Sequence, residues 1–207
     1  MASIKFLSSK KIDNFKGRLI YFGSTHQYGN IKNITEGSFF KPLDYQSISK
    51  CSSEYFFNKK ASDSKFNLTI LRFPNVYGYT TFSGANKDQG LLKNLINQAK
   101  LNRKIIIYDN KRFRHFLHIE DLANILLKIT TNNINVNELN IRGQKIEISQ
   151  IAKIIAKKTN SKILFKKMPF DLKKININNQ IISLKLFNKY FKSYKFKDIK
   201  TNINLEF

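Results

Sequence analysis

Short uninterrupted apolar runs alternate in this chain with longer segments whose apolar residues recur at helical spacing, and this alternation constrains the fold most. The runs that predict buried strands lie at residues 19–22, 67–73, 104–107, 138–141 and 162–165. The helical spacing predicts helices at 45–61, 90–101, 120–129, 149–158 with Ser149 as the cap, and 184–190. Strands that alternate with helices favour parallel pairing, in an α/β sheet covered on both faces.

The composition is compatible with a folded domain but strongly basic. The 207 residues are 42% hydrophobic, which is enough to bury a core, and the length allows one domain or one domain with a small appendage. Thirty-seven Lys and Arg against 14 Asp and Glu give a net charge of +23. Such a surface attracts anions, whether nucleic acid, an acidic membrane face or a phosphorylated small molecule. The abundance of Lys, Asn and Ile also permits a compositional origin of the charge.

Cysteine usage and the N-terminal residues exclude several classes of protein. The single cysteine, Cys51, rules out a disulfide framework, and no His/Cys cluster has the spacing of a zinc site. Residues 1–18 are polar, with only a three-residue apolar stretch, and nothing later approaches a membrane-spanning run. We therefore expect a soluble, cytoplasmic protein without a bound metal and without a membrane partner.

Four motifs carry the chemical information. The first, YFGSTHQYG at 21–29, places Ser24 just past a strand, where α/β sheets bind ligands, although a turn-forming Ser-Thr pair is the alternative. The second, KPLDYQSISKCSSE at 41–54, puts Tyr45 and Lys50 at the start of a helix, with Glu54 one turn after Lys50. The others are LRFPNVYG at 71–78 and RFRHFLHIEDLA at 112–123.

In this order the four motifs resemble the extended short-chain dehydrogenase/reductase family, the NAD-dependent epimerases and dehydratases of nucleotide sugars. The resemblance covers about residues 17–155. It implies a parallel-sheet, Rossmann-like α/β fold lacking its first strands, plus a small α/β substrate-binding part. Residues 1–80 would form the remaining half of the NAD domain, and residues 81–207 the substrate-binding part interleaved with the last sheet elements.

The resemblance also implies roles for individual residues. Ser24, Tyr45 and Lys50 would be catalytic, because in the family a tyrosine takes a proton from a sugar hydroxyl while hydride passes to NAD and a lysine favours the tyrosinate. Lys50 and Phe73 would bind the cofactor. The substrate would be bound by Asn75, by Leu92 in a stretch (89–92) that resembles the loop over the nucleotide base, and by Arg114 at the pyrophosphate.

Plainer roles stay open for some of these residues. Asn75 can cap a strand-end turn, and Arg114 can be one more solvated charge. His115 stands where the family usually has Asp, whereas His118 and Asp121 match family positions that fasten a strand-to-helix turn.

Two departures from the family pattern affect the expected chemistry. The family's tyrosine lies four positions before its lysine, but Gln46 lies four before Lys50, and an amide cannot act as that base. Tyr45, five positions before, could serve only if the first helical turn is distorted, because each residue turns a side chain by about 100°. No G-x-x-G-x-x-G phosphate loop is present, so we expect the sequence to correspond to the carboxyl half of the enzyme, as a fragment, a split gene or a truncated gene.

These observations leave three functional hypotheses. The first is an NAD-dependent epimerase or dehydratase of nucleotide sugars for surface-polysaccharide synthesis, truncated, with a homodimer or a complementing amino-terminal fragment as partner. The second is a non-catalytic remnant that keeps a sugar-nucleotide surface or a protein-contact role. Nucleic-acid binding through the interleaved lysines and aromatic residues of 187–197 is the least favoured, because that pattern is more often an apolar helix face with solvated lysines.

Overall fold

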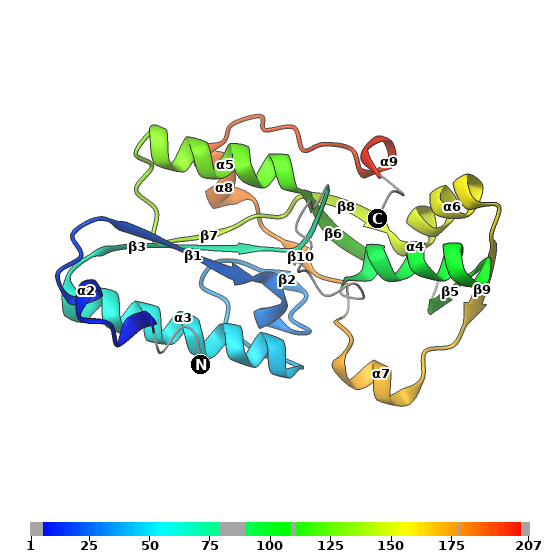
Figure 1. Ribbon diagram of the computed structural model, residues 1–207, viewed down its shortest axis with the longest axis horizontal. Coiled ribbons are helices and arrows are strands. Elements are labelled where there is room, and N and C mark those ends of the chain that lie inside the picture. The colour runs from blue at the N-terminus through cyan, green and yellow to red at the C-terminus, as the bar shows by residue number, and fades with distance from the viewer. Residues whose placement is uncertain (1–5, 79–89, 109–110, 178, 204–207) are drawn as a thin grey trace. The chain divides into compact units, whose positions relative to one another are not determined.

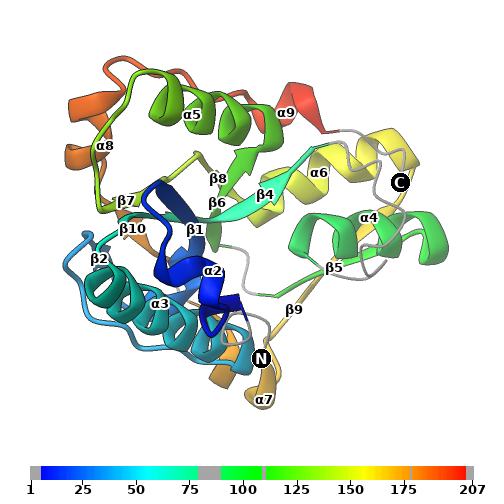
Figure 2. The ribbon, with the colours of Figure 1, turned by 60° about the vertical axis from the view of Figure 1, so that its left-hand side comes forward.

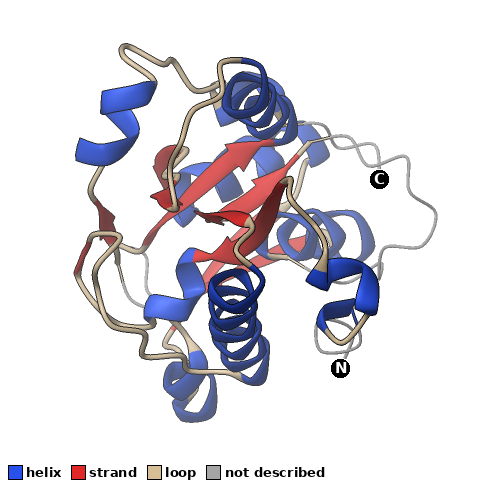
Figure 3. Cartoon of the chain, turned by 90° about the vertical axis from the view of Figure 1, so that its left-hand side faces the viewer, coloured by secondary structure: helices blue, strands red, loops and turns tan. Residues whose placement is uncertain are grey.

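The computed structural model describes residues 6–78, 90–108, 111–177 and 179–203, and the remaining residues are drawn in grey in Figure 3. The chain divides into two compact units that are interleaved in sequence. Unit 1 comprises Met1–Pro74, Lys128–Ile141 and Gln180–Tyr194, and unit 2 comprises Asn75–Leu127, Arg142–Asn179 and Lys195–Phe207. Helix α5 (Ile119–Thr131) runs from unit 2 into unit 1.

Unit 1 is built on a three-stranded sheet in the order β1-β3-β7, with both pairs parallel. Strand β1 pairs with β3 along its whole length, from Arg18 opposite Asn67 to Ser24 opposite Phe73. The elements of unit 1 are α2 (Lys10–Asp13), β1 (Arg18–Ser24), the 3-10 helix η1 (Thr25–Tyr28), β2 (Asn33–Ile34), α3 (Tyr45–Ser64), β3 (Asn67–Phe73), β7 (Glu138–Asn140), β10 (Ile181–Ile182) and α8 (Lys185–Tyr190). The short strands β2 and β10 form a second parallel pair.

Helix α3 packs along β1 and β3, as Figure 1 shows. It begins after Asp44, whose side chain accepts a hydrogen bond from the Ser47 backbone N–H, and it ends at Lys65 with a left-handed φ of 53°. One stripe of the helix is buried, and its Phe57 ring lies 4.7 Å from the Tyr21 ring of β1. Because a helix stripe and a sheet face bury each other, this contact forms part of the core of unit 1.

Unit 2 contains two small sheets. Strand β4 pairs in parallel with β6, β6 pairs antiparallel with β8, and β5 pairs in parallel with β9. Helices α4 and α6 lie side by side over β5, and Figure 2 shows this arrangement. The elements of unit 2 are β4 (Asn75–Tyr77), α4 (Leu91–Asn102), β5 (Lys104–Tyr108), β6 (Phe113–His118), β8 (Gln144–Glu147), α6 (Ile148–Thr159), β9 (Lys162–Lys166), α7 (Phe170–Ile175) and α9 (Ile199–Asn202).

The structure confirms the α/β, parallel-sheet fold class and corrects two details. Ser149 is not the cap of α6, because the helix starts at Ile148 after Glu147, and the Ser149 hydroxyl donates to the Glu147 carboxylate at 3.2 Å. Parallel pairing does not hold for β6 and β8, neither of which was expected as a strand. Within the described ranges, no helix is both long and apolar enough to cross a membrane.

Candidate functional site

The carboxyl ends of β1 and β3 bring Ser24 and Phe73 together. These residues are direct partners in the ladder, and the rings of Phe22 and Phe73 lie 5.4 Å apart. The Ser24 N–H donates to the Gln27 side-chain oxygen at 2.7 Å, and its hydroxyl oxygen accepts from the His26 N–H at 3.2 Å. This capping box of η1 holds the Ser24 hydroxyl at the edge where α/β sheets bind ligands.

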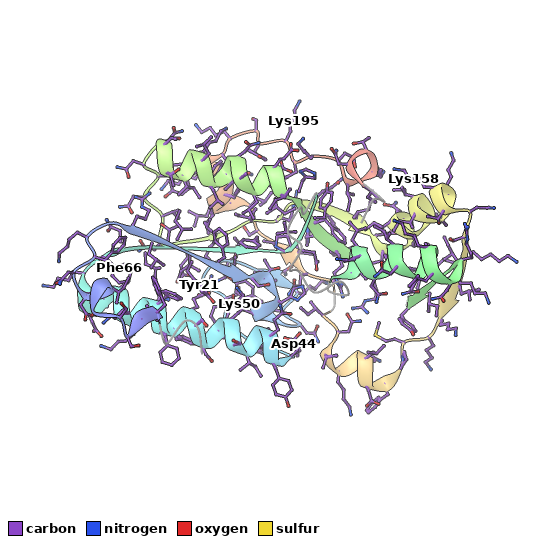
Figure 4. The ribbon with its side chains drawn as sticks, in the orientation of Figure 1. Tyr21, Asp44, Lys50, Phe66, Lys158 and Lys195 are labelled. Carbon is purple, nitrogen blue, oxygen red and sulfur yellow. The ribbon has the colours of Figure 1, made fainter. Side chains whose placement is uncertain are left out.

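Lys50 reaches the same edge from α3. Its ammonium group donates to the carbonyl oxygen of Phe22 at 2.7 Å and lies 5.5 Å from the centre of the Tyr21 ring, and Figure 4 labels both side chains. Burial lowers the pKa of Lys50 and raises that of Tyr21. Tyr21 therefore stays protonated at neutral pH and is not the missing base.

Tyr45 is not brought to Lys50. The first turn of α3 is regular, since the Ser47 N–H donates to the Asp44 carboxylate at 2.7 Å, and Tyr45 is 91% exposed. In a regular helix Tyr45 points about 140° away from Lys50 around the axis, whereas Gln46 is only about 40° away. The residue on the lysine's side of the helix is thus an amide.

A buried ionic network anchors α3 one turn beyond Lys50. Arg72 and Glu54 have side chains only 2% exposed, and the Arg72 Nε lies 3.1 Å from each Glu54 oxygen. Arg72 also donates to Glu138 at 2.7 Å and to the Tyr28 hydroxyl at 2.7 Å. Burial is the largest single influence on Arg72 and opposes its charge, but the hydrogen bonds to Glu54 and the charge interactions with Tyr28, Glu54 and Glu138 together outweigh burial and raise the pKa of Arg72. The network fixes the helix that carries Lys50 to the end of β3.

In unit 2, Asn75 and Leu92 have structural contacts of their own. The Asn75 side-chain amide donates to the His115 carbonyl oxygen at 3.2 Å, which ties β4 to β6. The Leu92 side chain is 7% exposed and packs in the core of the unit. Any contact from Leu92 to a ligand would therefore come from its backbone N–H, because the N–H groups of the first turn of a helix have no acceptor within the helix. Gln89 lies outside the described residues.

Arg114 is a half-buried cation held by neutral oxygens. It donates to the Asn176 side-chain oxygen at 2.7 Å, to the Ile177 carbonyl at 2.6 Å and to the Phe113 carbonyl at 3.0 Å. Burial and the neighbouring Arg112 lower the pKa of Arg114 to about 10. In the part of the chain that the structure describes, no carboxylate forms an ion pair with Arg114. Its charge is therefore available to an anionic ligand.

Arg112 shares the acceptors of Arg114, a feature that the sequence analysis missed. Its guanidinium donates to Asn176 at 2.6 Å and also to the Ile177 carbonyl. Strand alternation could have indicated that Arg112 and Arg114 lie on one face, because residues two apart in an extended segment point to the same side.

His118 fastens the turn between β6 and α5, whereas Asp121 ties the start of α5 to the segment at Lys197. The His118 Nδ1 accepts from the Glu120 N–H at 3.2 Å, and the Asp121 carboxylate accepts from the Lys197 N–H at 2.9 Å. Burial lowers the pKa of His118. Among the described side chains, no group of three His, Cys, Asp or Glu residues is placed to hold a metal ion.

Comparison with known families identifies the chain. The profile of the NAD dependent epimerase/dehydratase family matches residues 3–141, more than half of the sequence. The chain belongs to this family. NAD is accordingly the cofactor of its family. The search of curated proteins found no match to the chain.

Solved structures confirm the fold. UDP-glucuronic acid 4-epimerase from Bacillus cereus, in complex with UDP-glucuronic acid and NAD, superposes with a TM-score of 0.79 at 17% identity, covering 100% of this chain and 64% of that one. UDP-N-acetylglucosamine 4-epimerase from Methanobrevibacter ruminantium M1, in complex with UDP-N-acetylmuramic acid, superposes with a TM-score of 0.77 at 19% identity, and the match covers 99% of this chain and 65% of that one. TunA, an NAD-dependent NDP-hexosamine 5,6-dehydratase of tunicamycin biosynthesis, superposes with a TM-score of 0.75 at 18% identity, and the match covers 91% of this chain and 61% of that one. The chain thus spans less than two thirds of the length of each.

Proposed function

We propose that this chain supplies the nucleotide-sugar-binding portion and part of the nicotinamide site of an NAD-dependent epimerase or dehydratase that serves surface-polysaccharide synthesis. The observation that carries the proposal is Arg114, a half-buried guanidinium with neutral partners in a chain of this family. A guanidinium of this kind suits a pyrophosphate, which it can contact through two N–H groups at once.

The end of β1 and β3 fits the nicotinamide-ribose end of NAD, because Lys50 offers an ammonium group there and Ser24 a hydroxyl. The sequence given contains no Gly-rich loop for the cofactor's phosphates. NAD, when bound, supplies a hydride acceptor. Lys50 would hold the ribose hydroxyls, Phe73 would pack beside the nicotinamide, and Ser24 would hydrogen-bond the sugar. Asn75 and the Leu92 N–H would contact the substrate.

Gln46 favours a second candidate, a sugar-nucleotide-binding protein without redox chemistry. In a catalytic chain Tyr45 would supply the base, which requires the first turn of α3 to rearrange. Turnover of UDP- and dTDP-sugars in the presence of NAD separates the two functions. A catalytic chain loses turnover in Tyr45→Phe, whereas a binding protein shows no turnover in either form.

Calorimetry with NAD, UDP-glucose, UDP-glucuronic acid and dTDP-glucose tests the proposal. We expect at least one nucleotide sugar to bind, and Arg114→Gln to weaken it by about 10-fold or more, since a hydrogen bond to a charged group contributes about 1.5–3 kcal/mol. Lys111→Gln removes the same charge from an exposed side chain next to β6 and should change the affinity less than about 2-fold. The proposal fails if no UDP- or dTDP-sugar binds at millimolar concentration.

A further inference from the structure

One segment of unit 2 exposes large apolar side chains. Residues 164–175 run from the second half of β9 through α7, and no residue of α7 is buried. The large apolar side chains of this segment are between 38% and 72% exposed, and they belong to Leu164, Phe165, Phe170, Leu172 and Ile175. Exposed apolar side chains that gather in one place are typical of an interaction site.

The segment is anchored on both sides. Strand β9 pairs with β5 as far as Lys166, which lies opposite Tyr108, and Met168 is buried. Just past α7, the Asn176 side-chain oxygen and the Ile177 carbonyl accept hydrogen bonds from Arg114 of β6, at 2.7 and 2.6 Å. Between these anchors α7 lies apart from α4 and α6 of the same unit in Figures 1 and 2. The apolar side chains are therefore presented by an anchored part of the fold.

Positive charge surrounds these apolar side chains. Four exposed lysines lie within the segment against a single carboxylate, that of Asp171, which is 3.4 Å from the Lys174 ammonium group. Among the residues that the structure describes, Lys166, Lys167 and Lys173 form no ion pair. A partner that covers the segment should therefore combine negative charge with an apolar layer.

The surface of an anionic lipid bilayer has both properties. Its headgroups match the lysines, and the boundary with the acyl chains accepts phenylalanine and leucine side chains. Nucleic acid matches the charge and can stack on the two phenylalanines, but the aliphatic side chains of the segment have no ring to stack on a base. A second copy that docks through the same surface would set lysines against lysines. The charge and the apolar side chains together thus favour a membrane surface.

We propose that residues 164–175 dock this protein on the surface of a membrane that contains anionic lipids. Phe165, Phe170 and Leu172 would enter the boundary between headgroups and acyl chains, and the lysines would lie among the headgroups. Such docking needs no spanning helix, because the segment lies in the plane of the interface. The inference revises the expectation of a protein without a membrane partner, which rested on the lack of a membrane-spanning run in the sequence. It does not depend on the nucleotide-sugar site.

Co-sedimentation with vesicles tests the inference, using phosphatidylcholine either by itself or mixed with an equal part of phosphatidylglycerol. At about 0.1 M salt we expect the anionic vesicles to bind at least about 10-fold more tightly, and at about 1 M salt, where the Debye length falls to about 3 Å, that preference should disappear. Lys166→Gln/Lys167→Gln should weaken binding about 25-fold, because each lysine near an anionic surface contributes about 5-fold. Phe165→Ser/Phe170→Ser should weaken it about 10-fold or more.

Matched controls lie elsewhere in unit 2. Lys153→Gln/Lys157→Gln removes the same charge from exposed positions on α6, and Leu101→Ser removes an apolar side chain of α4 that is 80% exposed. Each control should change vesicle binding less than about 2-fold, because charges farther than a Debye length from the lipid are screened. Circular dichroism checks that every variant is folded, and if the phenylalanine variant does not fold, the two lysine variants decide.

Several results would overturn the inference. If Lys153→Gln/Lys157→Gln weakens binding as much as Lys166→Gln/Lys167→Gln, the overall charge of +23 drives binding and the segment does not. Equal affinity for the two kinds of vesicle, or no binding to the anionic ones, also contradicts it. If the vesicles are not bound and the variants of the segment instead lose a gel shift with an oligonucleotide or lose a dimer in sedimentation, the partner is nucleic acid or a second copy.

Discussion

Replacing Glu54 with glutamine removes one charge of a buried ion pair while leaving the shape of the side chain almost unchanged. Glu54 and Arg72 are each 2% exposed, and Arg72 contacts Glu54 through both Nε and Nη2. In Glu54→Gln the Arg72 cation stays buried, and its remaining carboxylate partner is Glu138, 2.7 Å away and 36% exposed. The substitution therefore leaves a poorly compensated charge in the core of unit 1.

The expected cost follows from the penalty for a broken buried pair. Removing one partner of such a pair costs about 3–5 kcal/mol, and because Glu138 still neutralises part of the charge we expect about 3 kcal/mol. For a chain of this length each kcal/mol shifts the melting temperature by about 2–4 °C, so the melting temperature should fall by about 6–12 °C.

Urea unfolding followed by circular dichroism measures this free energy, provided that the slope with urea is unchanged. The matched control is Asp63→Asn, which breaks the exposed pair between Asp63 and Lys59 on the same helix and should cost less than about 0.5 kcal/mol. The double variant Glu54→Gln/Arg72→Met should recover part of the loss, because it no longer buries a lone cation. A cost below about 1 kcal/mol for Glu54→Gln would refute the reasoning.

Three further predictions concern unit 1. Asp44→Ala removes the capping box of α3 and should cost about 1 kcal/mol in urea unfolding. Gly29→Ala should cost more, about 1–3 kcal/mol, because the glycine has a φ of 55° and a Cβ there would lie 1.8 Å from the Lys41 carbonyl oxygen, whereas Gly37→Ala meets no atom within 4 Å and should be tolerated. In NMR of ¹³C-methylated protein, Lys50 should titrate below the usual range of a lysine, because burial lowers its pKa. Since folding lowers this pKa, the contribution of Lys50 to stability rises with pH between its folded and unfolded values, and an unshifted Lys50 signal would contradict the buried placement.

Local patterns in the sequence predicted much of the fold. The strand expected at residues 67–73 has the bounds of β3, because a continuous apolar run there stops at Pro74, which has no backbone N–H to donate. The helix expected at residues 45–61 starts at Tyr45 as α3 but continues to Ser64. The expected end was too early because the last turn of the helix is polar and gives no apolar periodicity. The reversed direction of β8 relative to β6 could not be predicted, because alternation within a strand says nothing about the direction of its partner.

The candidate site was less accessible to sequence reasoning. The i to i+4 spacing from Gln46 to Lys50 places those two residues on one side of α3, which the regular first turn bears out. Long-range contacts carry no such signal. Asn176 lies 62 residues after Arg114 and 64 after Arg112, so that only the folded chain shows the two guanidinium groups on a single acceptor.

Phosphorus NMR of UDP-glucose and dTDP-glucose tests the central claim most directly, because it reports on the diphosphate that Arg114 is proposed to hold. On addition of the protein we expect the two ³¹P resonances of at least one nucleotide sugar to shift or broaden, and we expect Arg114→Gln to abolish most of that change while Lys111→Gln preserves it. Unchanged ³¹P resonances with the wild-type chain, or the same change with Arg114→Gln, would contradict the account.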